Sequence, residues 1–507
     1  MEKMLTMTPC RLARCDSKKQ EEAPISGEYV LPEYCPDVAT ILKCYAYPRL
    51  QNRQWSGDQL MVDGIAVVRV VYADEQRQCV RTVEFAQPFT CSIRGLHQTE
   101  DTSVEIALSA KYLTCRAVSP RRIEVRGSVL VIAATECAVV KEMAVPNNMD
   151  GFYTRQEQIP ITVPGRRWEK IISVNESFEF DQSLPPAERL LGGECCAVIK
   201  ECKLLTGKAI IKGVLYVHQL YTDIASGNHT HCLNYAVPFS QILDASDAAD
   251  GLPYRVSVQV MSDSERCSIG PDGENTILDV TAKLLLQLQV YQKAEISLLY
   301  DAYHAVCPVE MKREEVICHI LYGQRYEEKK CSVSMTAPIQ QWREVLDISA
   351  QIVDYHCETQ DGNALLKGRI QIGVIVRDVD GEICYHECAE HFSTECACSG
   401  NQAKMEPTIT AVHYRASDDA LECVVALHIA VTDENVYHRQ VISDLHLCSD
   451  RPFSAPKSNA LLYYAETGET VWDIARACHT SPQDIIDENN LCGEEIAEKT
   501  ILLIPVS

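Results

Sequence analysis

The feature that most constrains the fold of this chain is a long internal repeat within its first 445 residues. In each of three copies a glycine opens a β-rich run, at Gly64, Gly213 and Gly368. These glycines are separated by 149 and 155 positions. Repeats of this length indicate tandem domains, because the repeats of solenoid proteins run only about 20–50 residues. A length of 507 residues also favours several domains over a single core.

Two further landmarks recur at a constant or nearly constant distance from the glycines. An apolar pair ends at Leu42, Leu191 and Leu346, in each case 22 residues before the glycine. A phenylalanine follows each glycine after 24 to 26 positions, at Phe89, Phe239 and Phe392. Agreement of several landmarks across three copies indicates duplicated domains.

Within each copy the hydrophobic pattern is mainly that of β-strands. Val104, Ile106 and Leu108 alternate with polar residues, and similar runs recur between turn-forming segments. Short alternating strands at such spacing predict tandem β-sandwich-like domains, so the expected fold class is mainly β. The segment before each key glycine is the exception, since its apolar spacing, as at 36–42, predicts one short helix with its apolar face inward.

Polar and proline-rich stretches set the expected domain boundaries. The prediction is a polar N-terminal lead at 1–26, repeat one at 27–145, repeat two at 152–306, repeat three at 326–446, a linker at 447–459 and a small terminal domain at 460–507.

The terminal domain has the order strand, helix, helix, strand. Apolar runs at 461–464 and 501–504 predict the two strands. Thr470 is expected to cap the first helix, while Ser481 followed by Pro482 is typical of the start of the second.

This terminal domain resembles a LysM domain, a small fold that binds ligands and performs no chemistry. The resemblance is carried by the Gly-Glu-Thr-Val-Trp run from Gly468 and the Asn-Asn-Leu run from Asn489. It implies a binding groove between the turn 468–471 and the turn 489–492. The implied groove residues are Gly468, Glu469, Thr470, Val471, Asn489, Asn490 and Leu491.

The repeats resemble SPOCS domains. The resemblance is carried by Pro36-Asp-Val-Ala-Thr-Ile-Leu42 in copy one and by the Lys-Gly pairs at Lys212 and Lys367 in the other copies. Together with the terminal domain, this architecture is similar to that of the SipL family of spore-coat morphogenetic proteins. The resemblance implies a non-enzymatic scaffold in the mother-cell cytosol that sits on the forespore surface and binds a coat-basement ATPase through its LysM domain. The alternative is a wall-associated protein whose LysM groove holds N-acetylglucosamine-containing glycan.

Charge and hydropathy limit the classes of binding partner and the cellular location that can be expected. The net charge of −24 argues against nucleic acid and anionic membranes, both of which attract basic surfaces. The residues from 459 onward contain nine acidic and two basic side chains, a net charge of −7 that does not favour anionic wall polymers. There is no recognisable secretion signal and no apolar run near the ~18 residues of a membrane helix, so a cytoplasmic location is expected.

No sequence motif indicates catalysis, and no cofactor is expected. His386 and His391 lie five residues apart, whereas a zinc-protease helix needs its histidines four apart. Cysteines and histidines between Cys384 and Cys398 offer zinc ligands, and a metal-dependent hydrolase is the weakest of three hypotheses. The Cys-x-x-Cys spacing that would support it is absent, so free thiols are the favoured interpretation.

Overall fold

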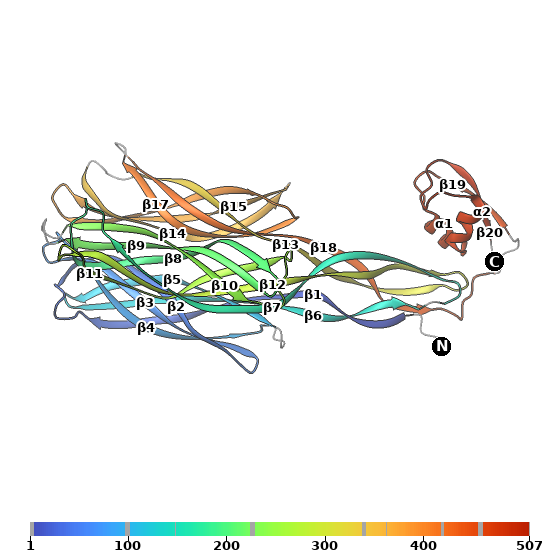
Figure 1. Cartoon of the computed structure of the whole chain (residues 1–507). Coiled ribbons are helices and arrows are strands. Elements are labelled where there is room, and N and C mark those ends of the chain that lie inside the picture. Colours follow the sequence, from blue (N-terminus) through green and yellow to red (C-terminus); the bar gives the residue numbers. More distant parts are fainter. Residues whose placement is uncertain are drawn as a thin grey trace.

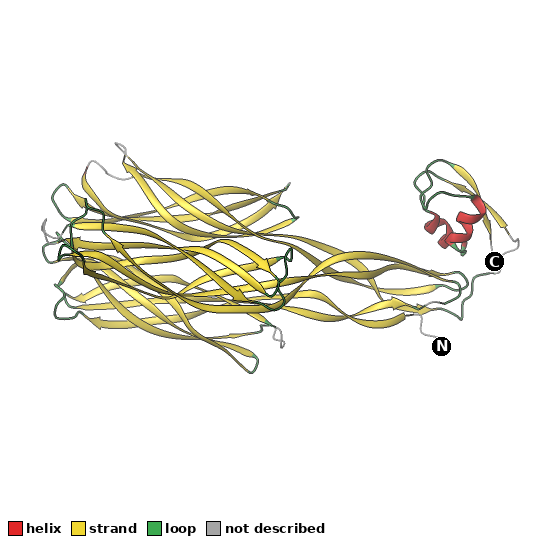
Figure 2. Ribbon diagram, viewed as in Figure 1, coloured by secondary structure: helices red, strands yellow, loops and turns green. Residues whose placement is uncertain are grey.

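The computed structural model describes residues 5–96, 102–147, 149–223, 229–336, 341–360, 362–416, 420–454 and 460–505. The molecule is elongated, with a broad β-sheet body that narrows into a stalk and a small helical domain at the stalk end (Figure 1). Strands dominate everything except that small domain (Figure 2), which confirms the predicted mainly β fold class. Among the described residues, no helix has the length and apolar character that crossing a membrane requires.

Each repeat has the same six strands in the same order. Repeat one comprises β1 (Leu5–Val30), β2 (Val38–Ser56), β3 (Gln59–Asp74), β4 (Val80–Arg94), β5 (Ser103–Ser119) and β6 (Arg122–Pro146). Repeat two comprises β7 (Phe152–Glu179), β8 (Ala187–Leu205), β9 (Lys208–Asp223), β10 (Thr230–Asp244), β11 (Tyr254–Ile269) and β12 (Asn275–His304). Repeat three comprises β13 (Val309–Thr336), β14 (Trp342–Gln360), β15 (Asn363–Asp378), β16 (Ile383–Ala397), β17 (Gln402–Ala416) and β18 (Ala420–Leu447).

The six strands of a repeat form two antiparallel sheets. The second, third and fourth strands make a meander, in the orders β2-β3-β4, β10-β9-β8 and β14-β15-β16. The first, last and fifth strands make the other sheet, in the orders β1-β6-β5, β11-β12-β7 and β13-β18-β17. Apolar side chains of both sheets fill one core per repeat, so each repeat is a β-sandwich.

The glycine and phenylalanine landmarks are cross-strand partners in the meander sheets. The paired residues are Gly64 and Phe89, Gly213 and Phe239, and Gly368 and Phe392. A Cβ atom added at any of the three glycines would come within 3.0 Å of the partner's ring. The missing side chain therefore makes room for the aromatic ring to lie across the central strand.

The helix predicted before each glycine is wrong, because β2, β8 and β14 lie there and pair with the central strands β3, β9 and β15. In repeat one, β2 begins at Val38 and pairs with β3. The register of this pairing shifts between Val38 and Thr40 and again between Ile41 and Lys43. Each bulge adds one residue, so the strand's period of two is broken. As a result Thr40 is exposed, whereas Val38 and Leu42 are buried and Ile41 is half-buried, which is the i, i+3, i+4 spacing of a helix face.

The predicted polar lead at 1–26 also needs correction, because β1 begins at Leu5 and pairs with β6 as far as Val30. The charged run 18–22 is exposed on this strand, and Ala23 and Ile25 are buried directly after it. Likewise β13 begins at Val309, inside the segment expected to bridge repeats two and three. In both places a polar stretch of an edge strand resembled a linker.

The stalk consists of three two-stranded ribbons, one from each repeat. We define it as residues 5–16, 136–146, 152–164, 291–304, 309–321 and 434–447. The ribbons share an apolar core to which all three contribute: Met143, Ile159, Ile161, Val163, Ile296, Leu298, Val316, Cys318 and Val441. The chain passes from one repeat to the next at the stalk tip (Figure 1), where β6 is followed by β7 and β12 by β13.

The three repeats surround a common axis. The landmark leucines Leu42, Leu191 and Leu346 belong to one buried cluster with residues at equivalent positions of the central strands, Val71, Leu220 and Ile375. Polar contacts link every pair of repeats: Arg69 Nη1 to the Gly193 carbonyl at 2.6 Å, His218 Nε2 to Asp347 Oδ1 at 3.1 Å and Lys43 Nζ to Ser349 Oγ at 3.2 Å. The repeats are therefore arranged like the subunits of a trimer within one chain.

The terminal domain has the predicted order of elements. These are β19 (Ala460–Ala465), α1 (Val471–Cys478), α2 (Pro482–Asn489) and β20 (Thr500–Pro505). The two strands pair antiparallel, and the helices cover one face of the hairpin around Val471, Ile474, Ile485 and Ile504.

Candidate functional site

The helices of the terminal domain begin and end where the sequence predicts. Thr470 Oγ1 accepts a hydrogen bond from the Asp473 amide at 3.1 Å, which confirms it as the N-cap of α1. Ser481 caps α2 in the same way, with Pro482 in the first turn. Asn490 ends α2 in the left-handed region at φ 50°.

The first turn of the predicted groove is hydrogen-bonded to the segment that follows the second turn. The Gly468 amide donates to the Ile496 carbonyl at 2.9 Å, and the Val471 amide donates to the Glu494 carbonyl at 2.7 Å. The segment that follows the turn 489–492 therefore lies alongside the turn 468–471. Gly468 and Asn490 are exposed, whereas Val471 is fully buried and serves as a core residue.

The polar side chains of the predicted groove are engaged within the domain. Asn489 Nδ2 donates to the Leu503 carbonyl at 2.7 Å, and its Oδ1 accepts from the Leu503 amide at 2.7 Å, so this side chain ties α2 to β20. Glu469 accepts from the Tyr463 hydroxyl at 3.0 Å and from the Glu466 amide at 2.8 Å. The hydrogen bond to Glu469 raises the pKa of Tyr463.

The sequence did not indicate that α1 docks onto the stalk. Asp301 of β12, which is 9% exposed, accepts from Trp472 Nε1 at 2.8 Å and from Arg476 Nη1 at 2.8 Å. Tyr303 packs edge-on against Trp472 with ring centroids 4.9 Å apart, and its hydroxyl donates to the Thr480 carbonyl at 2.7 Å. Burial raises the pKa of Tyr303.

A further contact from repeat two holds the domain in place. Arg155 lies over the Trp472 ring, 5.1 Å from its centroid, and forms an ion pair with Glu494. Together with Asp301 and Tyr303, Arg155 covers the α1 face of the domain. The one sequence signal for this contact was an aspartate within the apolar run of β12 from Ile296 to Tyr303.

The sheet of the terminal domain has an apolar face directed away from its helices. We define this outer face as Leu462, Tyr464, Ile501 and Leu503, which form the cross-strand pairs Leu462–Leu503 and Tyr464–Ile501. All four residues are exposed: Leu462 to 61%, Tyr464 to 73%, Ile501 to 55% and Leu503 to 37%.

The terminal domain carries many more acidic than basic side chains. Its two basic side chains, Arg476 and Lys499, pair with Asp301 and Glu466 respectively. Nine acidic side chains surround them in the sequence. The solvent-facing potential of the domain is therefore negative.

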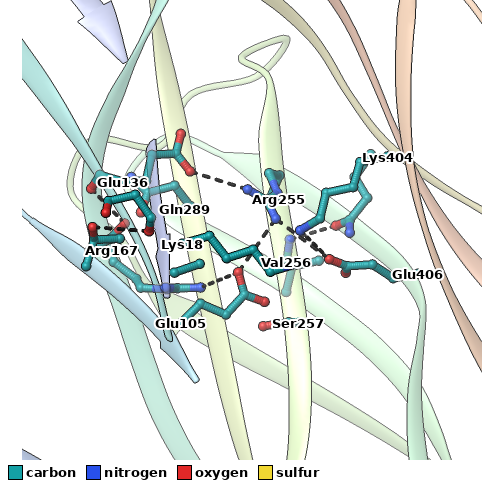
Figure 3. Close-up of a pocket in the computed structure, with 15 residues that line it drawn as sticks. Lys18, Glu105, Glu136, Arg167, Arg255, Val256, Ser257, Gln289, Lys404 and Glu406 are labelled. Carbon is teal, nitrogen blue, oxygen red and sulfur yellow. Dashed lines mark hydrogen bonds and ion pairs between the residues drawn. The ribbon is translucent and has the colours of Figure 1, made fainter. Parts of the chain in front are cut away.

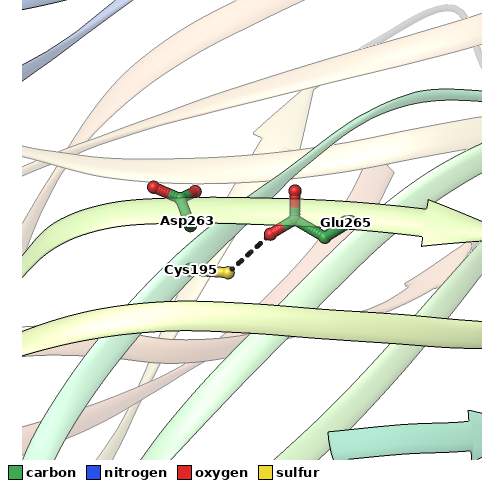
Figure 4. Close-up of side chains that lie close together, drawn as sticks. All are labelled: Cys195, Asp263 and Glu265. Atoms are coloured by element: carbon green, nitrogen blue, oxygen red, sulfur yellow. Dashed lines mark hydrogen bonds between the residues drawn. The ribbon is translucent and has the colours of Figure 1, made fainter. Parts of the chain in front are cut away.

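In the parts of the chain that the structure describes, the Cys384–Cys398 region holds no group of three ligand atoms close enough for a metal ion. One such group occurs elsewhere, where Cys195 of β8 meets Asp263 and Glu265 of β11 (Figure 4). The Cys195 thiol lies 3.2 Å from Glu265, and burial raises the pKa of both groups. Arg49 of repeat one pairs with Asp263 at 2.7 Å, so an internal cation already occupies this cluster.

Two cavities lie where the repeats meet. The smaller, about 190 Å³, is lined by ionic side chains of all three repeats (Figure 3). There Arg255 of repeat two reaches Glu136 at 3.3 Å, Glu105 at 3.6 Å and Glu406 at 3.9 Å. The larger, about 800 Å³, is lined by β2, β8, β14 and β17, among other strands, and contains the bond from the Tyr47 hydroxyl to Glu194 at 2.7 Å. In both cavities polar or charged side chains of different repeats bond to one another.

Comparisons with known protein families match three segments of the chain. The SipL, SPOCS domain model matches residues 37–118 and 186–269, and the LysM domain model matches residues 463–505. The chain therefore has two segments similar to the SPOCS domain of SipL and a C-terminal LysM domain. The comparison with curated proteins gave no significant match, and neither did the comparison with solved structures.

The SPOCS matches coincide with defined parts of the fold. They span β2–β5 in repeat one and β8–β11 in repeat two, and the long strands that build the stalk lie outside them. Repeat three lies outside the matches, yet it has the same strand order and sheets. SPOCS and LysM are binding domains rather than catalytic ones, and together they indicate a sporulation-related protein with a domain of the peptidoglycan-binding type.

Proposed function

We propose that this SipL-like protein is a non-enzymatic scaffold of spore-coat assembly. In this proposal it works in the mother-cell cytosol, at the forespore surface, and its LysM domain docks onto a coat-basement ATPase. The groove residues predicted from the sequence form the two turns of this domain.

The observation that carries the proposal is the internal use of the groove's polar side chains. The side chains of Asn489 and Glu469 form hydrogen bonds within the domain, and Thr470 caps α1. A glycan presents many hydroxyl and amide groups that need partners when water is removed from them. A groove whose polar side chains are already hydrogen-bonded, together with an exposed apolar face elsewhere on the domain, is better suited to a protein surface.

The position of the LysM domain also suits a scaffold. Contacts from Asp301, Tyr303 and Arg155 hold it at the stalk end, away from the three sandwiches (Figure 1). A partner bound there leaves the surface of the body open for other coat components.

Deletion of residues 460–507 tests the proposal. We expect the truncated protein to lose co-purification with the coat-basement ATPase of the same organism, while its repeats remain folded because each has its own core. Circular dichroism and a cooperative thermal transition serve as the control for folding. Undiminished binding of the ATPase by the truncated protein would contradict the proposal.

Glycan binding is the second candidate function, and the exposed turns at Gly468 and Asn490 favour it. The test is retention of the purified protein on peptidoglycan over a range of salt concentrations. Because the domain carries a net charge of −7, electrostatic attraction to anionic wall polymers is not expected. Strong retention that is insensitive to salt would favour the glycan function over the scaffold function.

A further inference from the structure

We propose that the protein partner docks on the outer face of the LysM sheet, and that the partner presents an apolar patch bordered by lysine and arginine side chains. This inference rests on the proposed function, because it assumes that the LysM ligand is a protein. It goes further by assigning the contact to the outer face rather than to the groove or to α1.

The outer face is a continuous apolar surface. Leu462 pairs with Leu503 and Tyr464 pairs with Ile501, so the four side chains form two adjacent cross-strand pairs on one side of the hairpin. Tyr464 is 73% exposed and stands at one end of the face. Aromatic side chains of this kind are frequent anchors of protein–protein contacts.

The fold of the domain does not account for these residues. The opposite side of the hairpin already supplies the core, through Ala465, Leu502 and Ile504, each at most 3% exposed. A sheet with one buried face normally alternates apolar residues inward and polar residues outward. Apolar residues on both sides indicate that a second surface is buried when the domain is at work.

The other surfaces of the domain are less suited to a partner. The α1 face is occupied by the stalk, since Trp472 and Arg476 both bind Asp301. The groove side chains Asn489 and Glu469 are engaged within the domain. The outer face thus remains as the apolar surface that a second protein could cover.

The acidic residues around the outer face indicate which residues should border the apolar patch of the partner. Asn489 binds the backbone of Leu503, which places the end of α2 with the exposed Asp487 and Glu488 beside the face. At the other end of the hairpin, Lys499 is paired with Glu466 and adds no free positive charge. A partner whose apolar patch is bordered by basic residues would complement this surface and associate faster at low salt.

The test compares the affinity of the purified coat-basement ATPase for three full-length proteins. The variant Tyr464→Thr with Ile501→Thr removes the apolar side chains at one end of the face and keeps residues that favour strands. The matched control is Tyr112→Thr with Ile242→Thr, at positions that are 56% and 55% exposed on repeats one and two. We expect the face variant to bind at least about tenfold more weakly than the wild type, and the control to bind like the wild type.

Folding and salt dependence complete the design. The thermal transition of the face variant should match that of the wild type, and the wild-type affinity should fall as salt increases. If the face variant binds like the wild type while the 460–507 deletion abolishes binding, this inference is overturned and the proposed function stands. Binding that survives the deletion overturns the proposed function itself. Retention of the wild type on peptidoglycan that the face variant loses would instead assign the face to glycan.

Discussion

At the scale of single residues, the repeat landmarks have a structural reason that the sequence alone does not reveal. The sequence shows that a phenylalanine follows each glycine, but their contact depends on the register of two neighbouring strands. In repeat two, a Cβ atom on Gly213 would meet both the ring of Phe239 and the carbonyl of Val198. The caps of the LysM helices are the opposite case, because Thr470 and Ser481 act within their own helices and were predictable.

Replacement of Gly213 by alanine should therefore destabilise the protein. The added methyl group would come within 3.0 Å of a backbone carbonyl, which cannot move as a flexible side chain can. We expect a loss of about 1–3 kcal/mol in the free energy of unfolding, measured by urea titration. Gly493→Ala is the control, because nothing lies within 4 Å of the added atom there. Equal stabilities of the two variants would contradict the overpacking argument.

At the scale of elements, local sequence patterns predicted structure only where the elements keep a regular period. The LysM helices have regular spacing and caps, and both were predicted correctly. The segment 36–42 gave a false helix because two bulges in β2 impose a helix-like spacing on a strand. The contact between α1 and the stalk joins Trp472 to Asp301, which are far apart in sequence and show no local pattern.

Loss of Asp301 should release the LysM domain from the stalk. In Asp301→Ala, the Trp472 indole and the Arg476 guanidinium both lose their buried acceptor. Leaving the buried indole donor unsatisfied costs about 1–3 kcal/mol, which is enough to weaken this contact. We expect faster hydrogen exchange across α1 and a separate thermal transition of the LysM domain. Asp487→Asn, at an exposed position of α2, is the control, and unchanged exchange in Asp301→Ala would disprove the role of Asp301.

At the scale of the whole molecule, the sequence predicted the number of repeats and their β-sandwich nature, but not their arrangement. Tandem domains can be strung out one after another or packed around a common axis, and no local sequence pattern distinguishes these two arrangements. The arrangement depends on single residues from different copies, such as Leu42, Leu191 and Leu346, that meet on the axis. The same contacts explain why the landmark leucines recur in each copy.

The contact between repeats two and three should depend on pH. Burial lowers the pKa of His218, but hydrogen bonds to Asp347 and Cys232 outweigh it and raise the pKa to about 12. The folded pKa thus lies above the unfolded value of about 6.5, so this contribution to stability is full below pH 6.5 and declines as the pH rises towards 12. We expect His218→Gln to melt below the wild type at pH 6, with a smaller difference at pH 10. A difference that stays constant or grows with pH would argue against a charged His218.

Hydrogen exchange of the full-length protein, alone and bound to the coat-basement ATPase, tests the central claim most directly. The claim is that the LysM domain binds a protein through its outer face. It predicts that binding slows amide exchange in 460–465 and 500–505, while exchange in the groove turns 468–471 and 489–492 is unchanged. Slower exchange confined to the groove turns or to the SPOCS repeats, with β19 and β20 unaffected, would contradict it.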